Sequence, residues 1–434
     1  MTHRSRDAWL GRLERSASSY FRHEVDKVTG LVRDKSLAGA PASIAGSGFA
    51  LTCYAIGAER GYLSRDDAAE RSRRALRFLY DAPQGEGSDA IGARGFFYHF
   101  LDMRTGHRVW DCELSTIDSS ILFAGALVAA GYFDRDTPAE REVRALADAL
   151  YCRADWEWAF DGGPMVSLGW HPDKGFLTNR WNGYSEALIL YLLGLGSPTH
   201  PLPASSYKAW CQGYRWMKLY GHEFVYAGPL FIHQLSHGWV DFRGIQDAYM
   251  RKRGIDYFEN SRRATYVQRE YAIRNPRRFT GYDADCWGIT ASDGPGPATR
   301  SIAGVDRRLW DYHARGVPYG PDDGTLSPWA LLASLPFAPE IVVPSIEAVG
   351  KRYPTIGRAY GFAASFNPTV RTRSSDTAGW VSPAHFAINQ GPVVLMIENF
   401  RSDLVWRVMR QCPYIVTGLQ RAGFRGGWLD SRGR

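Results

Sequence analysis

Apolar and amphipathic helical segments alternate along the first two thirds of the chain, and this alternation constrains the fold more than any other feature. Helices are predicted over 10–28, 43–60, from Ser64 onward, and over 117–130, 140–151, 185–195, 207–220, 239–253 and 256–274. Fully apolar helices that alternate with one-sided ones are typical of an inner helical ring enclosed by an outer ring. The sequence therefore predicts an all-α barrel of paired helices, formed as a single domain over residues 1–434.

Long loops rich in glycine, proline and tryptophan separate these helices. They span residues 81–111, 156–182 and 287–323. Long irregular loops on a compact scaffold are usually functional or disordered, and these are too aromatic to be disordered. Short β segments are predicted at 94–100 and 393–397. We therefore expect long aromatic loops on one rim of the barrel, where they form the walls of a groove.

The aromatic content and the charge pattern indicate the class of ligand. The chain has 15 Trp, 23 Tyr and 21 Phe, and the flat apolar faces and polar groups of Trp and Tyr suit sugar rings. An aromatic core accounts for more than half of them. The net charge is +7, but basic and acidic residues are interleaved, as in 66–74, so no stripe follows a phosphate backbone. We expect no nucleic-acid partner.

Other protein classes find no support in the sequence. The six cysteines are scattered and contain no C-x-x-C pair, a pattern of neither a disulfide framework nor a zinc site. No G-x-S-x-G, Walker or dinucleotide motif is present. No apolar run follows Met1 and no segment reaches the length of a membrane span. We expect a soluble protein without a cofactor, periplasmic or secreted if a leader has been removed and cytoplasmic otherwise.

Three acidic residues, Asp111, Glu113 and Asp118, precede or begin the apolar helix predicted over 117–130. Hydrolysis of a glycosidic bond requires two carboxyl groups beside that bond, one protonated and one charged. Capping of the helix by Ser115 or Asp118 explains the pattern equally well. Both interpretations stay open at this point.

Glu186 stands at the start of another strongly apolar helix, shortly after Trp181 and Tyr184. A glutamate there is costly to bury unless it is paired or protonated, and burial raises the pKa of a carboxyl group, as a general acid requires. The alternative is the glutamate of a capping box, but Gly183 at the matching upstream position has no side chain to cap with. The sequence favours Glu186 as a general acid.

His233, His237 and Asp241 would share one face of a helix running through them, which suggests a metal site. The segment has no H-E-x-x-H motif, however, and Gly238 interrupts it. We therefore predict no metal. A wall of hydrogen-bonding groups for sugar hydroxyls is the preferred interpretation, and structural histidines are the alternative.

Several motifs together resemble the bacterial glycoamylase-like family of glycoside hydrolases, which contains the endo-β-1,2-glucanases. The resemblance is carried in order by E-L-S-T-I-D (113–118), W-N-G-Y-S-E (181–186), H-G-W-V-D-F-R (237–243), C-W-G-I-T (286–290) and residues 391–399, and it covers nearly the whole chain. The corresponding domain of cyclic β-1,2-glucan synthases is similar, though more distantly. The resemblance implies an (α/α)6 barrel, no metal, and an acidic cleft in which Glu186 and Asp118 are the key carboxyl groups, with Asp111 and Glu113 close by.

Two positions depart from the pattern of the family. Asn389 stands where an aspartate usually precedes Gln-Gly-Pro, and Ala364 stands where the Gly-Phe-x-Asp-Ala motif usually has its aspartate. If either position supplies or orients the general base in relatives, activity or linkage preference differs here. Asp376, in a nearby loop, is a candidate replacement.

The resulting prediction is an endo-acting, inverting hydrolase of β-1,2-glucan or a related β-glucan, with Glu186 as general acid and Asp118 activating water. The predicted ligand is a β-glucan oligo- or polysaccharide. Its predicted binding residues are Trp181, Tyr184, Trp239 and Trp287, which would stack on sugars, and His233, His237, Asp241 and Arg243, which would bind hydroxyl groups. The alternatives are a β-glucan transglycosylase and a non-catalytic glucan-binding protein, and Asn389 and Ala364 favour the latter.

Overall fold

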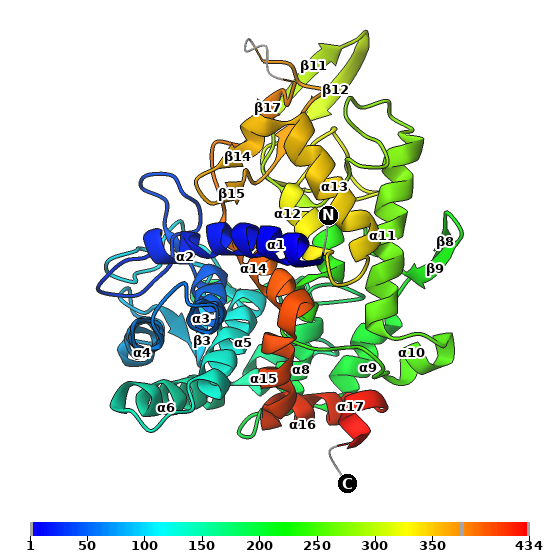
Figure 1. Ribbon diagram of the computed structural model, residues 1–434. Helices are drawn as coiled ribbons and strands as arrows, with labels where there is room; N and C mark the ends of the chain where they lie inside the picture. The colour runs from blue at the N-terminus through cyan, green and yellow to red at the C-terminus, as the bar shows by residue number, and fades with distance from the viewer. Residues whose placement is uncertain (1–2, 373–376, 432–434) are drawn as a thin grey trace.

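The computed structural model describes residues 3–372 and 377–431 and is predominantly helical (Figure 1). Five helices are buried along most of their length because their sequences are largely apolar. They are α3 (Ile44–Glu59), α5 (Thr116–Tyr132), α8 (Leu188–Gly196), α12 (Pro328–Ala333) and α14 (Ala387–Ser402). Helix α3 packs between α5 and α14, α5 also packs on α8, and α14 also packs on α12.

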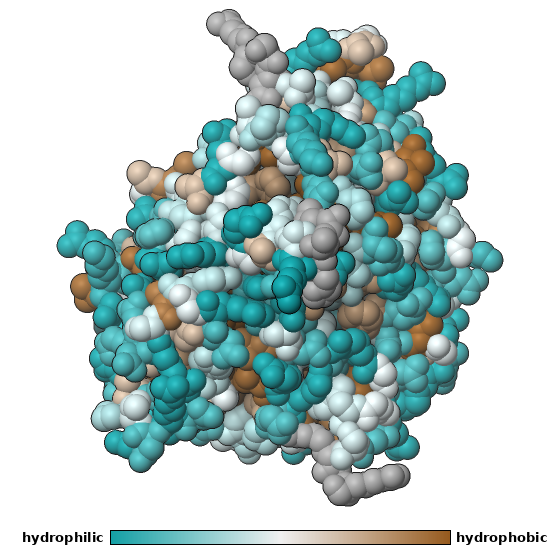
Figure 2. Space-filling view, in the orientation of Figure 1, coloured by the Kyte–Doolittle hydropathy of each residue, from teal (hydrophilic) through white to brown (hydrophobic). Residues whose placement is uncertain are grey.

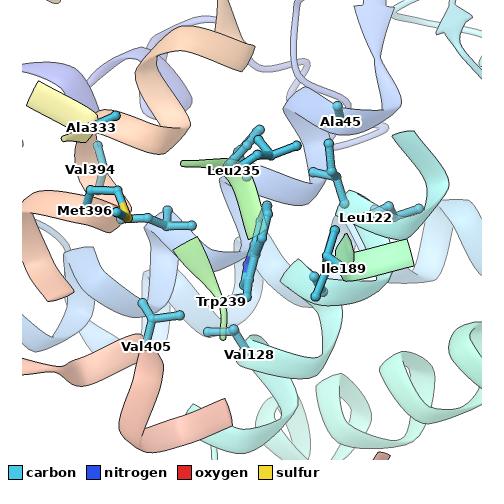
Figure 3. Close-up of a cluster of buried hydrophobic side chains, with 14 of the residues drawn as sticks. Ala45, Leu122, Val128, Ile189, Leu235, Trp239, Ala333, Val394, Met396 and Val405 are labelled. Atoms are coloured by element: carbon cyan, nitrogen blue, oxygen red, sulfur yellow. The ribbon is translucent and has the colours of Figure 1, made fainter. Parts of the chain in front are cut away.

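Two 3-10 segments, η1 (Leu230–His233) and η2 (Leu235–Gly238), pack between α8 and α12. The Ser236 hydroxyl oxygen accepts a hydrogen bond from the backbone N–H of Ile189 at 3.1 Å. On the other side, the Gln234 side-chain amide donates to the backbone oxygen of Ala330 at 2.7 Å. Trp239, which follows η2, lies among Val128, Ile189 and other side chains of the buried helices (Figure 3).

Amphipathic helices cover this buried set. They are α1 (His3–Ser18), α4 (Arg65–Asp81), α6 (Pro138–Arg153), α11 (Tyr257–Arg274), α13 (Pro339–Arg352) and α16 (Pro413–Arg421). Helix α1 packs on α14, α4 on α3, α6 on α5, α16 on α8, α13 on α12, and α11 on η1. The shorter helices are α2 (Tyr20–His23), α7 (Trp156–Phe160), α9 (Ala204–Gln212), α10 (Ala248–Arg253), α15 (Leu404–Gln411), α17 (Gly427–Asp430) and the 3-10 helix η3 (Pro354–Ile356).

The β structure is small, and part of it lies at the starts of two buried helices. An antiparallel sheet has the order β2 (Gly92–Ala93), β3 (Phe96–Tyr98), β5 (Leu114–Ser115), β6 (Gly169–His171) and β7 (Gly175–Phe176). Strand β5 leads directly into α5, and β1 (Ala42–Ser43), which pairs with β4 (Phe100–Leu101), leads into α3. Ser43 and Ser115 then cap these helices by accepting hydrogen bonds from backbone N–H groups. The strand pairing and the serine caps therefore fix where α3 and α5 begin.

Five further two-stranded antiparallel pairs lie in the loops. They are β8 (Trp216–Leu219) with β9 (His222–Val225), β10 (Ala291–Ser292) with β13 (His313–Ala314), β11 (Ala298–Ile302) with β12 (Val305–Leu309), β14 (Gly357–Arg358) with β15 (Gly361–Phe362), and β16 (Phe366–Asn367) with β17 (Trp380–Val381). The surface facing the viewer in Figure 2 is mostly hydrophilic, with scattered hydrophobic patches. Within residues 3–372 and 377–431, no helix combines the length and apolarity needed to cross a membrane.

The structure confirms most of the predicted helices. Those over 43–60, 117–130, 140–151 and 256–274 are present within a few residues, and Ser64 caps α4 by accepting a hydrogen bond from the N–H of Asp67. The predicted β segment over 94–100 is confirmed by β3. In contrast, the β segment over 393–397 was wrong because these residues lie inside α14. A short apolar run does not distinguish a buried strand from a buried helix.

Four predicted helices were too long or started too early. The segment over 207–220 is helical only to Gln212 and then forms β8, and residues 239–253 are helical only in α10. Helix α10 starts late because Asp247 caps it by accepting from the N–H of Met250. Helix α1 ends at Ser18 rather than extending to residue 28, and α8 begins at Leu188 rather than at residue 185. Apolar spacing continues through these turns and so conceals the breaks.

Candidate active site

A cavity of about 570 Å³ lies at the N-terminal ends of α5, α8 and α14. Helix N-termini carry partial positive charge and favour acidic groups. Four carboxyl groups and several aromatic side chains line the cavity. The acidic residues are Asp34, Asp118, Glu186 and Asp293, and the aromatic ones are Phe100, Trp110, Phe231, Tyr312, Trp329 and Phe386. The combination of acidic groups and aromatic walls provides both chemistry and a surface for sugar rings.

Glu186 lies two residues before α8 and reaches the cavity half-buried. Its backbone oxygen accepts a hydrogen bond from the Ser236 hydroxyl at 3.1 Å, which ties it to η2. Burial raises the pKa of Glu186 to about 7, and the negative charge of Asp118 adds to this shift, while a hydrogen bond to its own backbone opposes it. A carboxyl group with this pKa is protonated in a large fraction of molecules at neutral pH. Glu186 can therefore donate a proton.

Asp118 is the third residue of α5 and is 5% exposed. The Ser115 hydroxyl donates to Asp118 Oδ2 at 2.5 Å, and the same hydroxyl oxygen accepts from the Asp118 backbone N–H at 3.2 Å. Ser115 is thus the helix cap. The carboxylate of Asp118, which lines the cavity, remains available for another role.

His99 links Asp118 to Glu113. Its Nδ1 lies 2.8 Å from Glu113 Oε1 and its Nε2 lies 3.6 Å from Asp118 Oδ1. Burial opposes protonation of His99, but the charges of Asp118, Glu113 and Asp34 together raise its pKa to about 9. Burial raises the pKa of Glu113, whereas the hydrogen bond and charge of His99 lower it, with a net decrease. A protonated imidazole therefore joins Glu113 to the carboxylate of Asp118, which lines the same cavity as Glu186.

Asp34 and Asp293 line the cavity but were not predicted. The backbone oxygen of Asp34 accepts from the N–H of Ala387 at 2.8 Å, which holds Asp34 beside the start of α14. Burial raises the pKa of Asp34 to about 6; Asp118 adds to the shift, whereas His99 and Lys35 oppose it. The Ser382 hydroxyl donates to Asp293 Oδ2 at 2.8 Å. Asp293 falls within the loop over 287–323 that was predicted as a groove wall, but no local motif marks either residue.

Asn389, one of the two departures from the family pattern, also lines the cavity. It is 1% exposed, and neither its Oδ1 nor its Nδ2 has a hydrogen-bond partner among the described residues. An unpaired buried amide costs about 1–3 kcal/mol, so such a group in a site calls for a functional explanation. Ala364, the other departure, is buried in a small hydrophobic cluster with Ala384 and Phe386.

The aromatic residues predicted to stack on sugars are not among the residues that line the cavity. Trp239 stacks on Phe49 with ring centroids 5.1 Å apart, and the Trp287 indole donates to Ser345 Oγ at 2.9 Å. Both tryptophans are buried in the core.

Trp181 and Tyr184 lie nearer the turn before Glu186. The half-buried Trp181 donates its indole N–H to Thr116 Oγ1 at 3.0 Å, which joins the turn to the start of α5. The ring of Tyr184 is buried and stacks on that of Tyr257. Both side chains hold the segment that carries Glu186.

Of the polar residues predicted to bind hydroxyl groups, His233, His237 and Asp241 are buried, whereas Arg243 is partly exposed. Burial lowers the pKa of His233 to about 4 and that of His237 to about 3, so both are neutral. His237 Nε2 lies 3.0 Å from Ser261 Oγ. Asp241 forms ion pairs with Arg243 at 2.8 Å and with Arg410 at 2.5 Å. In the part of the chain that the structure describes, no group of three or more His, Cys, Asp or Glu residues is placed to hold a metal ion.

Asp111 and Asp376 complete the predicted set. Asp111 is exposed and follows Trp110, and both residues have positive φ angles. The backbone oxygen of Asp111 accepts from the Arg108 guanidinium at 2.6 Å. Asp376 lies outside the described residues. The fold therefore brings Glu186, Asp118 and, through His99, Glu113 together.

Comparisons with known proteins show which family the chain resembles. The family model described as "Putative glucoamylase" matches residues 178–413. A structure described as a putative glucoamylase from Bacteroides uniformis has a TM-score of 0.84 and 31% identity, covering 96% of this chain and 97% of the other. The endo-β-1,2-glucanase from Chitinophaga pinensis has a TM-score of 0.80 and 28% identity over 97% of this chain and 99% of its own.

A curated relative is the exo β-1,2-glucooligosaccharide sophorohydrolase (non-reducing end) of Parabacteroides distasonis. It is 30% identical over 412 residues, which cover 86% of this chain and 52% of the relative. The chain thus spans about half the length of that relative.

Proposed function

This chain belongs to the glycoamylase family, and on that premise we propose that it is a glycoside hydrolase that cleaves β-1,2-glucan. The observation that carries the proposal is the pairing of Glu186 and Asp118 in one aromatic-walled cavity. Hydrolysis of a glycosidic bond needs one carboxyl group that gives a proton and a second group that stays charged. The relatives that act on β-1,2-linked glucans support the choice of linkage.

In this mechanism Glu186 is the general acid and protonates the oxygen of the leaving sugar. Asp118, with the cationic His99 3.6 Å away, accepts a proton from the attacking water. Attack by water opposite the leaving group inverts the anomeric centre. We also propose that the enzyme cleaves bonds within the glucan chain rather than at its end. Glu113 acts through His99, which it holds in place at 2.8 Å.

The substrate-binding part of the proposal also needs a revised set of residues. Phe100, Trp110 and Tyr312 offer ring faces to sugars from the walls of the cavity, and Asn389 and Asp34 offer polar groups to hydroxyls. Trp181 and Tyr184 then position Glu186. His233, His237, Asp241, Arg243, Trp239 and Trp287 stabilise the fold around the cavity through the contacts given above. No metal takes part in the proposed reaction.

The proposed scaffold is an (α/α)6 barrel in a single domain. The order of packing supports a closed inner ring of α3, α5, α8, the η1–η2 segment, α12 and α14, because each member packs on the next and α14 packs on α3. The amphipathic helices that cover these members form the proposed outer ring. In such a ring α14 stands opposite α8, so Asn389 and Glu186 approach the substrate from opposite sides.

A non-catalytic glucan-binding protein is the second candidate function. The observation that favours it is the absence of a carboxyl group at Asn389 and Ala364, where relatives usually carry aspartate. A binder and a hydrolase would share the cavity and its aromatic walls, and only the release of new reducing ends distinguishes them. If those ends appear but are rejoined to other chains, the protein is a transglycosylase.

Glu186→Gln tests the proposal because it removes the proton but preserves the shape of the side chain. We expect turnover of linear β-1,2-glucan to fall by about 10²- to 10⁴-fold, while binding of the glucan, measured by calorimetry, persists. The wild-type kcat should decline as the pH rises through about 7, where Glu186 loses its proton.

Glu223→Gln, at an exposed position of β9, is the matched control and should leave turnover unchanged. Near-normal turnover by Glu186→Gln would remove this residue from the mechanism. Glucan binding by the wild type without any reducing-end release would favour the binding protein instead.

A further inference from the structure

A second cavity of about 570 Å³ adjoins the candidate active site, and we name it the outer pocket. Its walls come from three loop segments. The first segment contributes Val25–Val28 and Arg33, and the second contributes Gly39–Pro41. The third contributes Asp102–Arg104, Val109 and Trp110. Trp110 lines both cavities. One indole therefore separates the outer pocket from the cavity that holds Glu186 and Asp118.

Trp110 is 67% exposed, although tryptophan is a large apolar side chain. Its ring meets the edge of Phe100 with centroids 5.2 Å apart. Phe100 in turn stacks on His99 at 3.9 Å, with an angle of 12° between the ring planes. A continuous row of rings thus leads from the outer pocket to the histidine beside Asp118, and such a surface suits successive sugar rings.

The backbone holds the Trp110 indole in this exposed position. Trp110 and Asp111 have φ angles of 59° and 47°, and each non-glycine residue in this region costs about 1–3 kcal/mol. The Arg108 guanidinium offsets this cost by donating to the backbone oxygens of Asp111 and Cys112, both at 2.6 Å. Arg108 also lies 4.8 Å over the ring of Tyr98. The turn is therefore braced rather than loose, and its indole is preorganised.

The remaining lining of the outer pocket suits a neutral, hydroxyl-rich ligand. Charged groups of both signs are present, with Asp26 and Asp102 opposing Lys27, Arg33 and Arg104. No single sign dominates, as it would in a site for an anion. Apolar side chains such as those of Met103 and Val109 also line the pocket. Aromatic and apolar faces with a mixed polar rim are the usual lining of a sugar site.

We propose that the outer pocket binds glucose units of the same glucan chain whose scissile bond lies beside Glu186. Trp110 is the shared platform on which the chain passes from one cavity to the other. This inference rests on the proposed function. Its consequence is a dependence on chain length, because a long glucan occupies both cavities whereas a trisaccharide occupies only the inner one.

The test compares kcat/KM for long linear β-1,2-glucan and for sophorotriose. Trp110→Ala should lower the value for the long glucan about three- to tenfold, the effect of one lost ring contact, and change the value for sophorotriose less. Val28→Arg fills the outer pocket from a residue that is 81% exposed and therefore tolerant of change. It should reproduce the selective loss. Tyr319→Ala, at an exposed ring that contacts Tyr226, is the control and should alter neither value.

Equal losses on both substrates, or none on the long glucan, would overturn the inference while the proposed function stands. If the wild type hydrolyses neither substrate, the proposed function fails, and calorimetry then decides the inference separately. The inference would be supported if the wild type binds the long glucan more tightly than sophorotriose and Trp110→Ala abolishes this difference. Binding that does not depend on length, or no binding, would refute it.

Discussion

At the scale of single residues, Asn389 is the clearest conflict between stability and function. Its amide is buried in α14 without a partner among the described residues, yet it faces the cavity. Other buried polar residues of the same helix are satisfied. Asn399 donates to the backbone oxygen of Gly238 at 2.9 Å and accepts from the N–H of Trp406 at 3.3 Å. Unpaired polar groups in otherwise consistent structures are concentrated at functional sites.

Asn389→Ala should therefore leave the free energy of unfolding unchanged or slightly higher, because no protein hydrogen bond is lost. It should lower kcat/KM for β-1,2-glucan about three- to tenfold per lost hydrogen bond to the substrate. Urea unfolding and initial rates on one preparation measure both effects. Asn399→Ala, the matched control, should destabilise by about 1–3 kcal/mol with little change in kcat/KM at equal folded fraction. A destabilised Asn389→Ala with normal kinetics would show that Asn389 is structural.

The sequence predicts some residues of the site and misses others for a physical reason. Glu186 and Asp118 were predicted because each stands at the start of an apolar helix, where a carboxyl group is unusual. Asp34 and His99 reach the same cavity from loops, and their partners lie far away in the sequence. Trp239 and Trp287 were assigned to sugars because no pattern distinguishes a core tryptophan from an exposed one.

At the scale of helices, an ion network joins α1 to α14. Arg401 of α14 lies 2.8 Å from Asp7 and 2.5 Å from Glu14 of α1, and Arg60 lies 2.6 Å from Glu398. Glu14 is fully buried, and burial together with the negative charge of Glu398 raises its pKa to about 8, although Arg401 opposes the shift. The native state thus holds a proton that the unfolded state releases, so this contribution to stability is lost as the pH rises through about 8.

Arg401→Met should expose this dependence. Removing one partner of a buried ion pair costs about 3–5 kcal/mol, and we expect a loss of this order at pH 9, where Glu14 of the wild type is charged and its ion pair with Arg401 stabilises the native state. The loss should be smaller at pH 6 because Glu14 is then protonated. Urea unfolding at both pH values measures it, with Arg300→Met on the exposed β11 as control. A loss that is equal at both pH values would contradict the role of Glu14.

Helix boundaries show which local signals were sufficient. The amphipathic α4 was predicted from its cap, Ser64, and α6 was predicted over 140–151 because one face is clearly polar. Residues 393–397 were misassigned because α14 is apolar on all sides and shows no helical period there. The break between η2 and α10 includes tertiary contacts such as the ion pair of Asp241 with Arg410, which a local pattern does not contain.

At the scale of the whole molecule, one connected cluster of buried hydrophobic residues runs from Leu10 to Leu429. A very close seam in this cluster lies between α3 and α5. A Cβ atom on Gly125 would meet the backbone oxygen of Gly48 at 2.0 Å, so only glycine allows these helices to cross so closely. Each buried helix packs directly on the next one, so a displacement at this seam is transmitted to the remaining helices.

Gly125→Ala should therefore lower the melting temperature of the whole molecule in one cooperative transition, as the proposed single domain requires. We expect the calorimetric and van't Hoff enthalpies to agree both in the wild type and in the variant. The loss of stability should exceed the 1–3 kcal/mol or so typical of overpacking, because the clash involves backbone that cannot move aside. Gly350→Ala in α13 is the control, since a Cβ there finds only ordinary contact with Phe362 at 3.6 Å. It should stabilise by about 0.5–1 kcal/mol. Two separate transitions, with only one of them shifted by Gly125→Ala, would show that the chain contains more than one folding unit.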